Sequence, residues 1–224
     1  MSRYGLLDPG TSLPVLESIC HVCDVRDSLE FGAGIWSTFS LIRNCESVTS
    51  IESDLKWVKK VRKDYSHKNN LDVIYWTKPM NEYLKETGKN FDLIFIDGDD
   101  RLQCLNDSVD RSPIIVCHDT HRKSMGWESA IIPDHYEGLT YIGCYPYFTT
   151  IFYHQDTNLK NILFDIDNFS HRGTYIDEEC WREVDKMKLK PSLMFKSGGK
   201  GIHGQVKKIL SFLQITNGET LLGV

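Results

Sequence analysis

The sequence predicts an α/β fold in which helices cover both faces of a doubly wound, mostly parallel sheet. Strand and helix patterns alternate along most of the chain. The strands 91–98 and 113–119 are almost continuously apolar, as strands buried on both faces are. The strand patterns 139–147 and 149–155 follow each other with almost no connection. Such a short join requires an antiparallel hairpin, so one strand of the sheet is reversed.

The chain is long enough for a full core and shows no sign of a membrane segment. It has 224 residues, of which 41 % are hydrophobic, and a formal net charge of −5. This charge argues against a protein whose main task is to bind nucleic-acid phosphates. No apolar run reaches the roughly 18 residues that a bilayer span needs, and the polar first residues do not resemble a signal peptide. We therefore expect a soluble, cytoplasmic protein with no membrane partner.

The first half of the chain supplies the beginning of the alternating order. Apolar residues at helical spacing predict its helices, as Trp36, Phe39 and Ile42 do for 35–43. Asp54 stands in the first turn of another helix, where a carboxylate interacts favourably with the helix dipole. The predicted order is helix 13–25, strand 27–31, helix 35–43, strand 48–51, helix 54–66, strand 71–76 and helix 81–86.

The second half completes the sheet and adds an extension. A helix is predicted for 124–132, between the second apolar strand and the hairpin. Residues 1–155 then form one domain with seven strands, of which the last is reversed. Residues 156–224 form a C-terminal extension that packs on this domain, with helical patterns at 177–190 and 205–215. The extension is a lid, a dimerisation arm or a substrate-binding element.

Three features allow a structural and a functional interpretation. The lysines of the extension form a solvated surface or a patch for an anionic acceptor. The glycine-rich segment 197–204 lacks the Walker spacing and is a flexible loop or a phosphate clamp. Cys20 and Cys23 share a helix face or bind a metal, although the scattered, odd set of cysteines indicates reduced thiols in general.

A glycine pair follows the first predicted strand. The sequence Glu30-Phe31-Gly32-Ala33-Gly34 leads from this strand into a helix. Gly32 permits a tight turn, and Gly34 lets the backbone approach a ligand. A dinucleotide fingerprint has a third glycine where this chain has Ser37. Glu52 ends the second strand, 22 residues after Glu30, where an acidic side chain binds ribose hydroxyls or caps the next helix.

Acidic residues also follow the two apolar strands. Asp97 and Asp100 lie in the run after the first of them, and His118, Asp119 and His121 follow the second. In a doubly wound sheet both runs face the ligand cleft. Carboxylates at such a position bind a hard cation, act as bases or are solvated loop residues.

These motifs together resemble those of class I S-adenosylmethionine-dependent methyltransferases. The resemblance rests on "LEFGAG", "IES", "FDLIFIDGD" and the terminal hairpin, and covers residues 12 to 155. It implies a Rossmann-like sheet of seven strands with a reversed last strand. It also implies S-adenosyl-L-methionine as the cofactor. In the family pattern Glu30 holds the methionine part, Gly32 to Gly34 pass close to the cofactor and Glu52 binds the ribose. Trp76 and Thr77 would lie near the adenine, and Ser37 and Asp97 complete the predicted cofactor-binding set.

The pattern "FIDGD…VCHD" is similar to that of small-molecule and sugar O-methyltransferases. Several members of this subset bind a divalent ion, which would place Mg²⁺ or another divalent cation on Asp97, Asp119 and His118. The alternative is a structural or cofactor-contact role for these residues. The subset has a histidine where this chain has Asp100, so the implied catalytic residues are Asp97 with Asp100 or His121 as the base.

The sequence thus favours a methyltransferase that modifies a hydroxyl of a sugar, a glycan or another small molecule. The missing base-reading motifs and the acidic charge oppose nucleic acid as the acceptor, for which only the basic extension speaks. A catalytically silent binding module is the third alternative, although the intact glycine pair with Glu30 and Glu52 argues against it. A homodimer through the extension is a further expectation.

Overall fold

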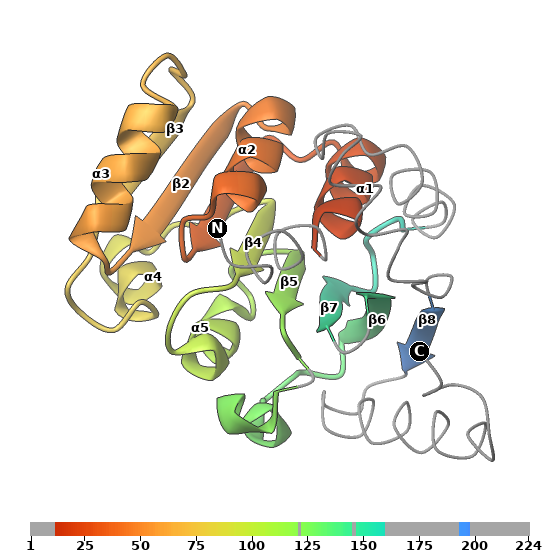
Figure 1. The fold of residues 1–224 in the computed structure, drawn as a ribbon. Coiled ribbons are helices and arrows are strands. Elements are labelled where there is room, and N and C mark those ends of the chain that lie inside the picture. Colours follow the sequence, from red (N-terminus) through yellow and green to blue (C-terminus); the bar gives the residue numbers. More distant parts are fainter. Residues whose placement is uncertain (1–11, 121, 145–146, 160–192, 198–224) are drawn as a thin grey trace.

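The computed structural model describes residues 12–120, 122–144, 147–159 and 193–197, and they form a sheet flanked by helices (Figure 1). The strand order is β3-β2-β1-β4-β5-β7-β6-β8. The first five strands are mutually parallel, and β7 is antiparallel to both β5 and β6. The strands are β1 (Asp27–Phe31), β2 (Ser47–Glu52), β3 (Leu71–Tyr75), β4 (Leu93–Ile96), β5 (Ile114–His118), β6 (Tyr136–Cys144), β7 (Tyr147–His154) and β8 (Leu193–Ser197). The predicted doubly wound sheet with a reversed strand is confirmed.

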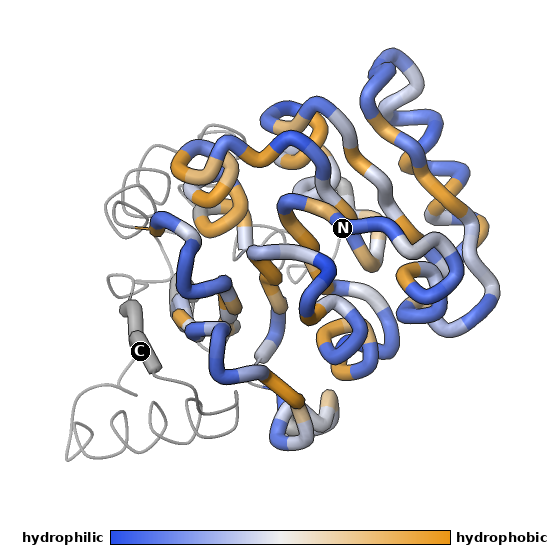
Figure 2. Tube along the Cα trace, turned by 180° about the vertical axis from the view of Figure 1, so that it is seen from behind, coloured by the Kyte–Doolittle hydropathy of each residue, from blue (hydrophilic) through white to orange (hydrophobic). Residues whose placement is uncertain are grey.

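Alternation along the central strands separates two hydrophobic clusters. On β4, Ile94 and Ile96 belong to one cluster and Leu93 and Phe95 to the other. All four side chains are fully buried, which explains the continuous apolar run. Figure 2 shows apolar segments inside the molecule and hydrophilic ones along its outer turns.

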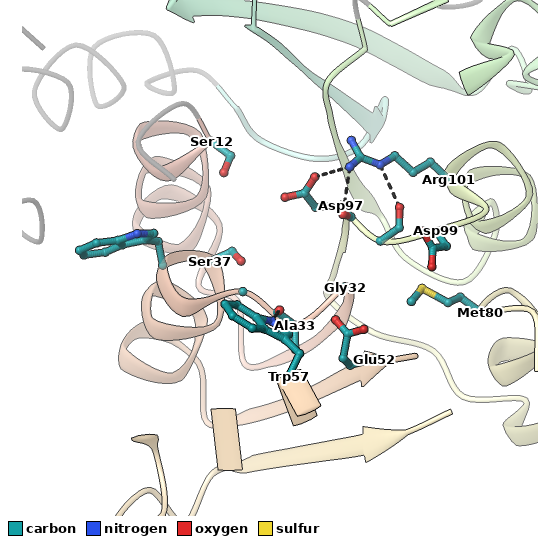
Figure 3. Close-up of a pocket in the computed structure, with 13 residues that line it drawn as sticks. Ser12, Gly32, Ala33, Ser37, Glu52, Trp57, Met80, Asp97, Asp99 and Arg101 are labelled. Carbon is teal, nitrogen blue, oxygen red and sulfur yellow. Dashed lines mark hydrogen bonds and ion pairs between the residues drawn. The ribbon is translucent and has the colours of Figure 1, made fainter. Parts of the chain in front are cut away.

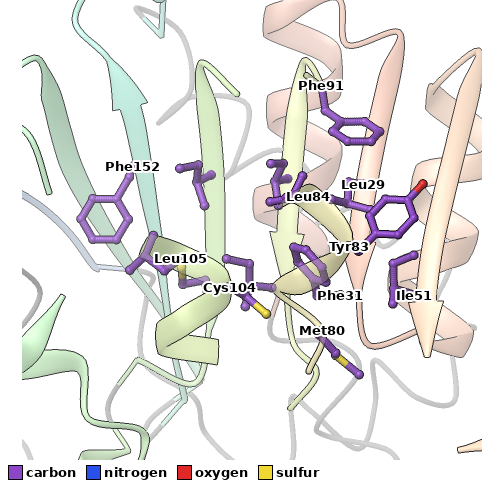
Figure 4. Packing of buried hydrophobic residues seen from close by; sticks show 14 of the residues in the cluster. Leu29, Phe31, Ile51, Met80, Tyr83, Leu84, Phe91, Cys104, Leu105 and Phe152 are labelled. Carbon is purple, nitrogen blue, oxygen red and sulfur yellow. The ribbon is translucent and has the colours of Figure 1, made fainter. Parts of the chain in front are cut away.

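Helices cover both faces of the sheet. Side chains of α4 (Glu82–Thr87) and α5 (Arg101–Ser108) join the first cluster, as Figure 4 shows for Tyr83, Leu84 and Leu105. The other face is covered by α1 (Leu13–Cys23), α2 (Ile35–Asn44) and α3 (Leu55–Asp64). None of the helices among the described residues is both long and apolar enough to cross a membrane.

One prediction of local structure was wrong, and two elements were not predicted. The segment 124–132 forms two short 3₁₀ turns, Lys123–Met125 and Trp127–Ser129, because Gly126 between them adopts a positive φ of 69°. Helix α5 was not predicted, since its sequence is mostly polar. Strand β8 in the extension was not predicted either, and it pairs antiparallel with β6. The predicted helices 177–190 and 205–215 lie outside the described residues.

The strand order places a switch point at β1. Strand β1 pairs with β2 on one side and with β4 on the other, so the loops after these strands leave the sheet in opposite directions. In open α/β sheets ligands bind at the carboxyl ends of the strands at such a point. The predicted glycine pair follows β1, and the predicted acidic residues follow β2 and β4.

Candidate functional site at the carboxyl ends of the central strands

A cavity of about 470 Å³ opens at the switch point (Figure 3). Its size is in the range of sites that enclose small molecules. The carboxyl ends of β1, β2 and β4 and the loops that follow them contribute most of its wall. The rest comes from α2, α3 and α5, from the residue before α1 and from the segment before α4. The lining residues are Ser12, Gly32, Ala33, Gly34, Trp36, Ser37, Glu52, Trp57, Met80, Asp97, Gly98, Asp99 and Arg101.

The loop after β1 passes directly against the loop after β4. Gly32 has a φ of +91°, a backbone conformation that residues other than glycine rarely adopt. A Cβ at Gly32 would lie 2.5 Å from the Cα of Gly98. Gly98 is equally confined, since its own Cβ would lie 2.9 Å from the Gly32 nitrogen. The glycines therefore let two loops meet at the floor of the cavity.

Glu30 supports this loop from behind. Its side chain is fully buried and does not line the cavity. Thr38 Oγ1 donates a 2.5 Å hydrogen bond to Glu30 Oε2 and accepts one from the Gly34 nitrogen at 2.9 Å. Ser50 Oγ donates to the same carboxylate oxygen at 2.6 Å. Glu30 thus positions the start of α2, whereas the family resemblance implies a direct contact with the cofactor.

Burial changes the acidity of Glu30. Desolvation raises the pKa of its carboxyl group to about 7. Hydrogen bonds from Ser37, Ser50 and Thr38 favour the ionised form, but they do not compensate for the loss of water. The group is therefore half-protonated near neutral pH.

Glu52 combines the two roles that the sequence left open. It lines the cavity at the end of β2. Its Oε1 also accepts a 2.7 Å hydrogen bond from the nitrogen of Asp54, the residue that caps α3 through the Lys56 and Trp57 nitrogens. This bond fixes the carboxylate at the cavity edge. Partial burial raises the pKa of Glu52.

The loop after β4 carries two carboxylates into the cavity wall. Asp97 and Asp99 both line it, and Asp99 Oδ2 accepts a 3.2 Å hydrogen bond from Ser53 Oγ in the loop after β2. Asp97 Oδ1 lies 2.8 Å from Arg101 Nη2 and 3.0 Å from His118 Nδ1. Both of these partners contact Oδ1, and no ion pair or hydrogen bond joins Asp97 Oδ2 to another of the described residues.

His118 is the buried partner of this carboxylate. Only 2 % of its side chain is exposed, and it does not line the cavity. Burial alone would lower the pKa of the imidazole, but the contact with Asp97 and the nearby charge of Asp119 outweigh it and raise the pKa. Protonation of His118 is therefore favoured by the carboxylates around it.

Arg101 joins the ends of β4 and β5, and no motif in the sequence predicts this role. Its side chain is 9 % exposed. Its Nη1 lies 3.2 Å from Asp119 Oδ2, a carboxylate oxygen that also contacts Arg122 Nη2 at 3.0 Å. Asp119, at 2 % exposure, is thus paired with two guanidinium groups.

A divalent ion does not fit these residues as they are arranged. Asp97, His118 and Asp119 do come together, with one potential ligand atom of each within 4.8 Å of the others. Arg101, however, already contacts both carboxylates. A Mg²⁺ ion would need carboxylate oxygens at about 2.1 Å in an octahedral arrangement. The buried guanidinium occupies one oxygen of each carboxylate and supplies the compensating charge.

The other predicted site residues lie elsewhere. Asp100 is the exposed N-terminal cap of α5, with a φ of 53°, and does not line the cavity. Trp76 and Thr77 also lie outside the lining; the Trp76 indole donates to the Pro79 carbonyl at 3.1 Å and packs on Tyr83. His121 lies outside the described residues.

Aromatic and apolar walls were missed as well. Trp57 lines the cavity from α3, and its indole Nε1 donates a hydrogen bond to the Ala33 carbonyl. Trp36 and Met80 line it too. The single-residue patterns around them predict only helix faces or a loop. Only the folded structure shows that these three side chains line the same cavity.

No family model and no curated protein matches the chain. Among solved structures, an rRNA methylase from Streptococcus thermophilus matches with a TM-score of 0.50 and 11 % identity, over 62 % of this chain and 93 % of that one. The protein has the Rossmann-like methyltransferase fold. The N-methyltransferase NodS from Bradyrhizobium japonicum WM9, in complex with S-adenosyl-L-homocysteine, shares this methyltransferase fold with a TM-score of 0.50 and 13 % identity, over 65 % and 85 % of the two chains.

Proposed function

We propose that the protein is a methyltransferase that binds S-adenosyl-L-methionine in the cavity at the switch point. One observation carries the proposal. The glycine loop after β1, the carboxylate that ends β2 and the acidic loop after β4 line a single cavity. These groups suit the parts of this cofactor. A carboxylate at the end of the second strand accepts hydrogen bonds from ribose hydroxyls, and glycine backbone allows close approach.

Each residue has a defined part in this proposal. Glu52, held by the Asp54 nitrogen, receives the ribose. Gly32 and Gly98 let the loops after β1 and β4 meet, and this contact forms the floor of the cavity. Trp57 and Met80 provide apolar wall for a flat ring. Glu30 acts through Thr38 as a positioning residue.

The acceptor we propose is a hydroxyl group of a sugar, a glycan or another small molecule. Glu52, Asp97 and Asp99 make the cavity wall acidic, which repels a polyanion such as nucleic acid. The lining cation Arg101 directs its guanidinium to protein acceptors and is not available for a phosphate. These observations favour a small acceptor over nucleic acid. Nucleic acid is the alternative acceptor because an rRNA methylase shares this fold.

The chemistry needs little beyond positioning and proton removal. The cofactor supplies a methyl group that is activated by its sulfonium sulfur. The acceptor oxygen attacks the methyl carbon as the carbon–sulfur bond breaks, and the hydroxyl proton must leave. Asp97 Oδ2 is the base that we propose, since Arg101 and His118 hold its other oxygen. This assignment replaces Asp100, which does not line the cavity.

Calorimetric titration with S-adenosyl-L-homocysteine tests the cofactor. We expect a dissociation constant near the micromolar range, about −8 kcal/mol. Glu52→Gln should weaken binding by about tenfold or more, because a buried hydrogen bond to a charged acceptor contributes roughly 1.5–3 kcal/mol. Glu46→Gln is the matched control, since Glu46 is exposed just before β2, at the other end of the same strand.

The titration has two informative failures. A folded protein that releases no heat with the ligand contradicts the proposed cofactor and favours a silent binding module. Equal weakening by both glutamine variants contradicts the role of Glu52. When binding is established, turnover with radiolabelled cofactor on sugars, simple alcohols, amines and RNA tests the acceptor. Incorporation into RNA alone would overturn the proposed acceptor class.

A further inference from the structure

The Arg101 side chain is enclosed by protein acceptors. Five oxygen atoms lie within 3.2 Å of its three nitrogens, which together carry five N–H donors. Nε donates to the Gly98 carbonyl at 2.9 Å, Nη1 to the His118 carbonyl at 3.0 Å, and Nη2 to the Asp97 carbonyl at 3.1 Å. The two carboxylates, on Asp97 and Asp119, complete the set.

This arrangement has the shape of a cation site with the cation already present. Three backbone carbonyls and two carboxylates surround the guanidinium, and both kinds of oxygen are ligands that hard divalent ions use. The ligands come from the ends of β4 and β5, so the cation ties these strand ends together. A guanidinium cannot be deprotonated in a protein, and it cannot be removed by a chelator.

We infer that Arg101 is a built-in replacement for a divalent metal at the Asp97–His118–Asp119 cluster. It neutralises the two carboxylates, orients Asp97 toward the cavity and keeps metal ions out. The cluster is then a latent metal site that one substitution exposes. This inference deepens the proposed function, because it makes the proposed methyl transfer independent of added metal. The predicted metal binding can be tested without a measurement of enzymatic activity.

Metal titration of purified proteins tests the inference, with Mn²⁺ as the probe. We expect no saturable Mn²⁺ binding by the wild-type protein and no change in its unfolding temperature. Arg101→Met removes the guanidinium but keeps a long side chain. The variant should bind Mn²⁺ at least about tenfold more tightly than wild type, and its unfolding temperature should rise with the Mn²⁺ concentration.

Two matched variants locate the effect. Arg122→Met removes the other arginine from Asp119 and leaves Arg101 in place, so it should gain no Mn²⁺ binding. The double variant Arg101→Met/Asp119→Asn should lose the gain, because it lacks one of the ligands.

Three results would overturn the inference. One is Mn²⁺ binding by the wild-type protein that Asp97→Asn abolishes, a comparison that does not require any Arg101 variant to fold. The second is a folded Arg101→Met protein that binds Mn²⁺ no better than wild type. The third is an equal gain in the Arg122→Met control. Turnover that a chelator abolishes, without Mn²⁺ binding at the cluster, would contradict only the claim that methyl transfer is independent of metal. Failure to bind S-adenosyl-L-homocysteine would contradict the proposed function and leave the inference about Arg101 untouched.

Discussion

At the scale of single residues, the site depends on carboxylates in unlike surroundings. Glu30 is fully buried and receives only neutral hydroxyl donors, so desolvation governs its protonation. Asp97 faces a guanidinium instead, and Glu52 receives a backbone N–H at the cavity edge. The carboxylate thus positions a helix in Glu30, is the proposed base in Asp97 and is the proposed ribose ligand in Glu52. Surroundings separate the three roles.

The raised pKa of Glu30 predicts a loss of stability as the pH rises. The pKa of the carboxyl group is 4.5 before folding and about 7 afterwards, so the native state binds more protons than the unfolded state between these values. The stabilisation is complete below about pH 4.5 and is lost as the pH rises through 7. The full difference corresponds to roughly 3 kcal/mol.

Urea unfolding at pH 5 and pH 8 measures this effect. Glu30→Gln retains a hydrogen-bond acceptor for Thr38 and Ser50 but cannot ionise. Relative to wild type, the variant should therefore be more stable at pH 8 than at pH 5. Glu46→Gln, an exposed change, should leave the difference between the two pH values as in wild type. An identical pH dependence for wild type and Glu30→Gln would show that Glu30 is not the responsible group.

At the scale of elements, the sequence was informative where burial imposes a pattern. Strands β4 and β5 were predicted from continuous apolar runs, and burial on both faces is the physical reason for such runs. Helix α5 escaped prediction because only a few of its side chains are apolar. The 3₁₀ turns near Trp127 were mistaken for a helix because buried apolar residues occur there without helical backbone.

The same limit applies to the site. The carboxyl ends of β1, β2 and β4 could be located from the sequence, because strand ends and ligand clefts are connected by topology. Arg101 could not, since a single arginine after an acidic run is also typical of a solvated loop. Only the fold shows that it returns to the ends of two strands. Similarly, the burial of Glu30 depends on helix α2 lying over it.

The contact between the β1 and β4 loops predicts that Gly32 is much less replaceable than other glycines. Gly32→Ala adds a Cβ 2.5 Å from a backbone atom at a φ of +91°. We expect a loss of at least about 2 kcal/mol of unfolding free energy, from backbone strain and the displaced loop. Gly88→Ala is the matched control: its φ is +62°, but no atom lies within 4 Å of the added Cβ. It should cost only about 1 kcal/mol. Equal costs in denaturant unfolding would contradict the close approach of the two loops.

At the scale of the whole molecule, the sheet offers a cavity at each end of its parallel strands. The candidate site lies at the carboxyl ends. A second cavity, of about 560 Å³, lies at the opposite edge and is lined by residues that include Asp92, Pro113 and His154. Only the first of the two lies at a switch point and combines glycine backbone with carboxylates from the ends of β2 and β4. The fold therefore favours the first cavity as the ligand-binding site, because ligands of open α/β sheets bind at the carboxyl ends of the strands.

Hydrogen exchange with and without S-adenosyl-L-homocysteine can test this distinction. A ligand that contacts the loops after β1, β2 and β4 must leave before those loops open. At a ligand concentration about 100 times the dissociation constant, opening should be suppressed by about 100-fold, and global unfolding should cost about 2.7 kcal/mol more. Peptides that contain residues 32–34, 53 and 97–99 should be protected most.

Peptides around Asn90 and Pro113, at the opposite edge, should be protected only by the added free energy of global unfolding. Preferential protection of these latter peptides would place the ligand in the second cavity. The same experiment on Glu52→Gln serves as the control, since weaker binding must reduce protection at 32–34 and 97–99 together if one ligand spans both loops.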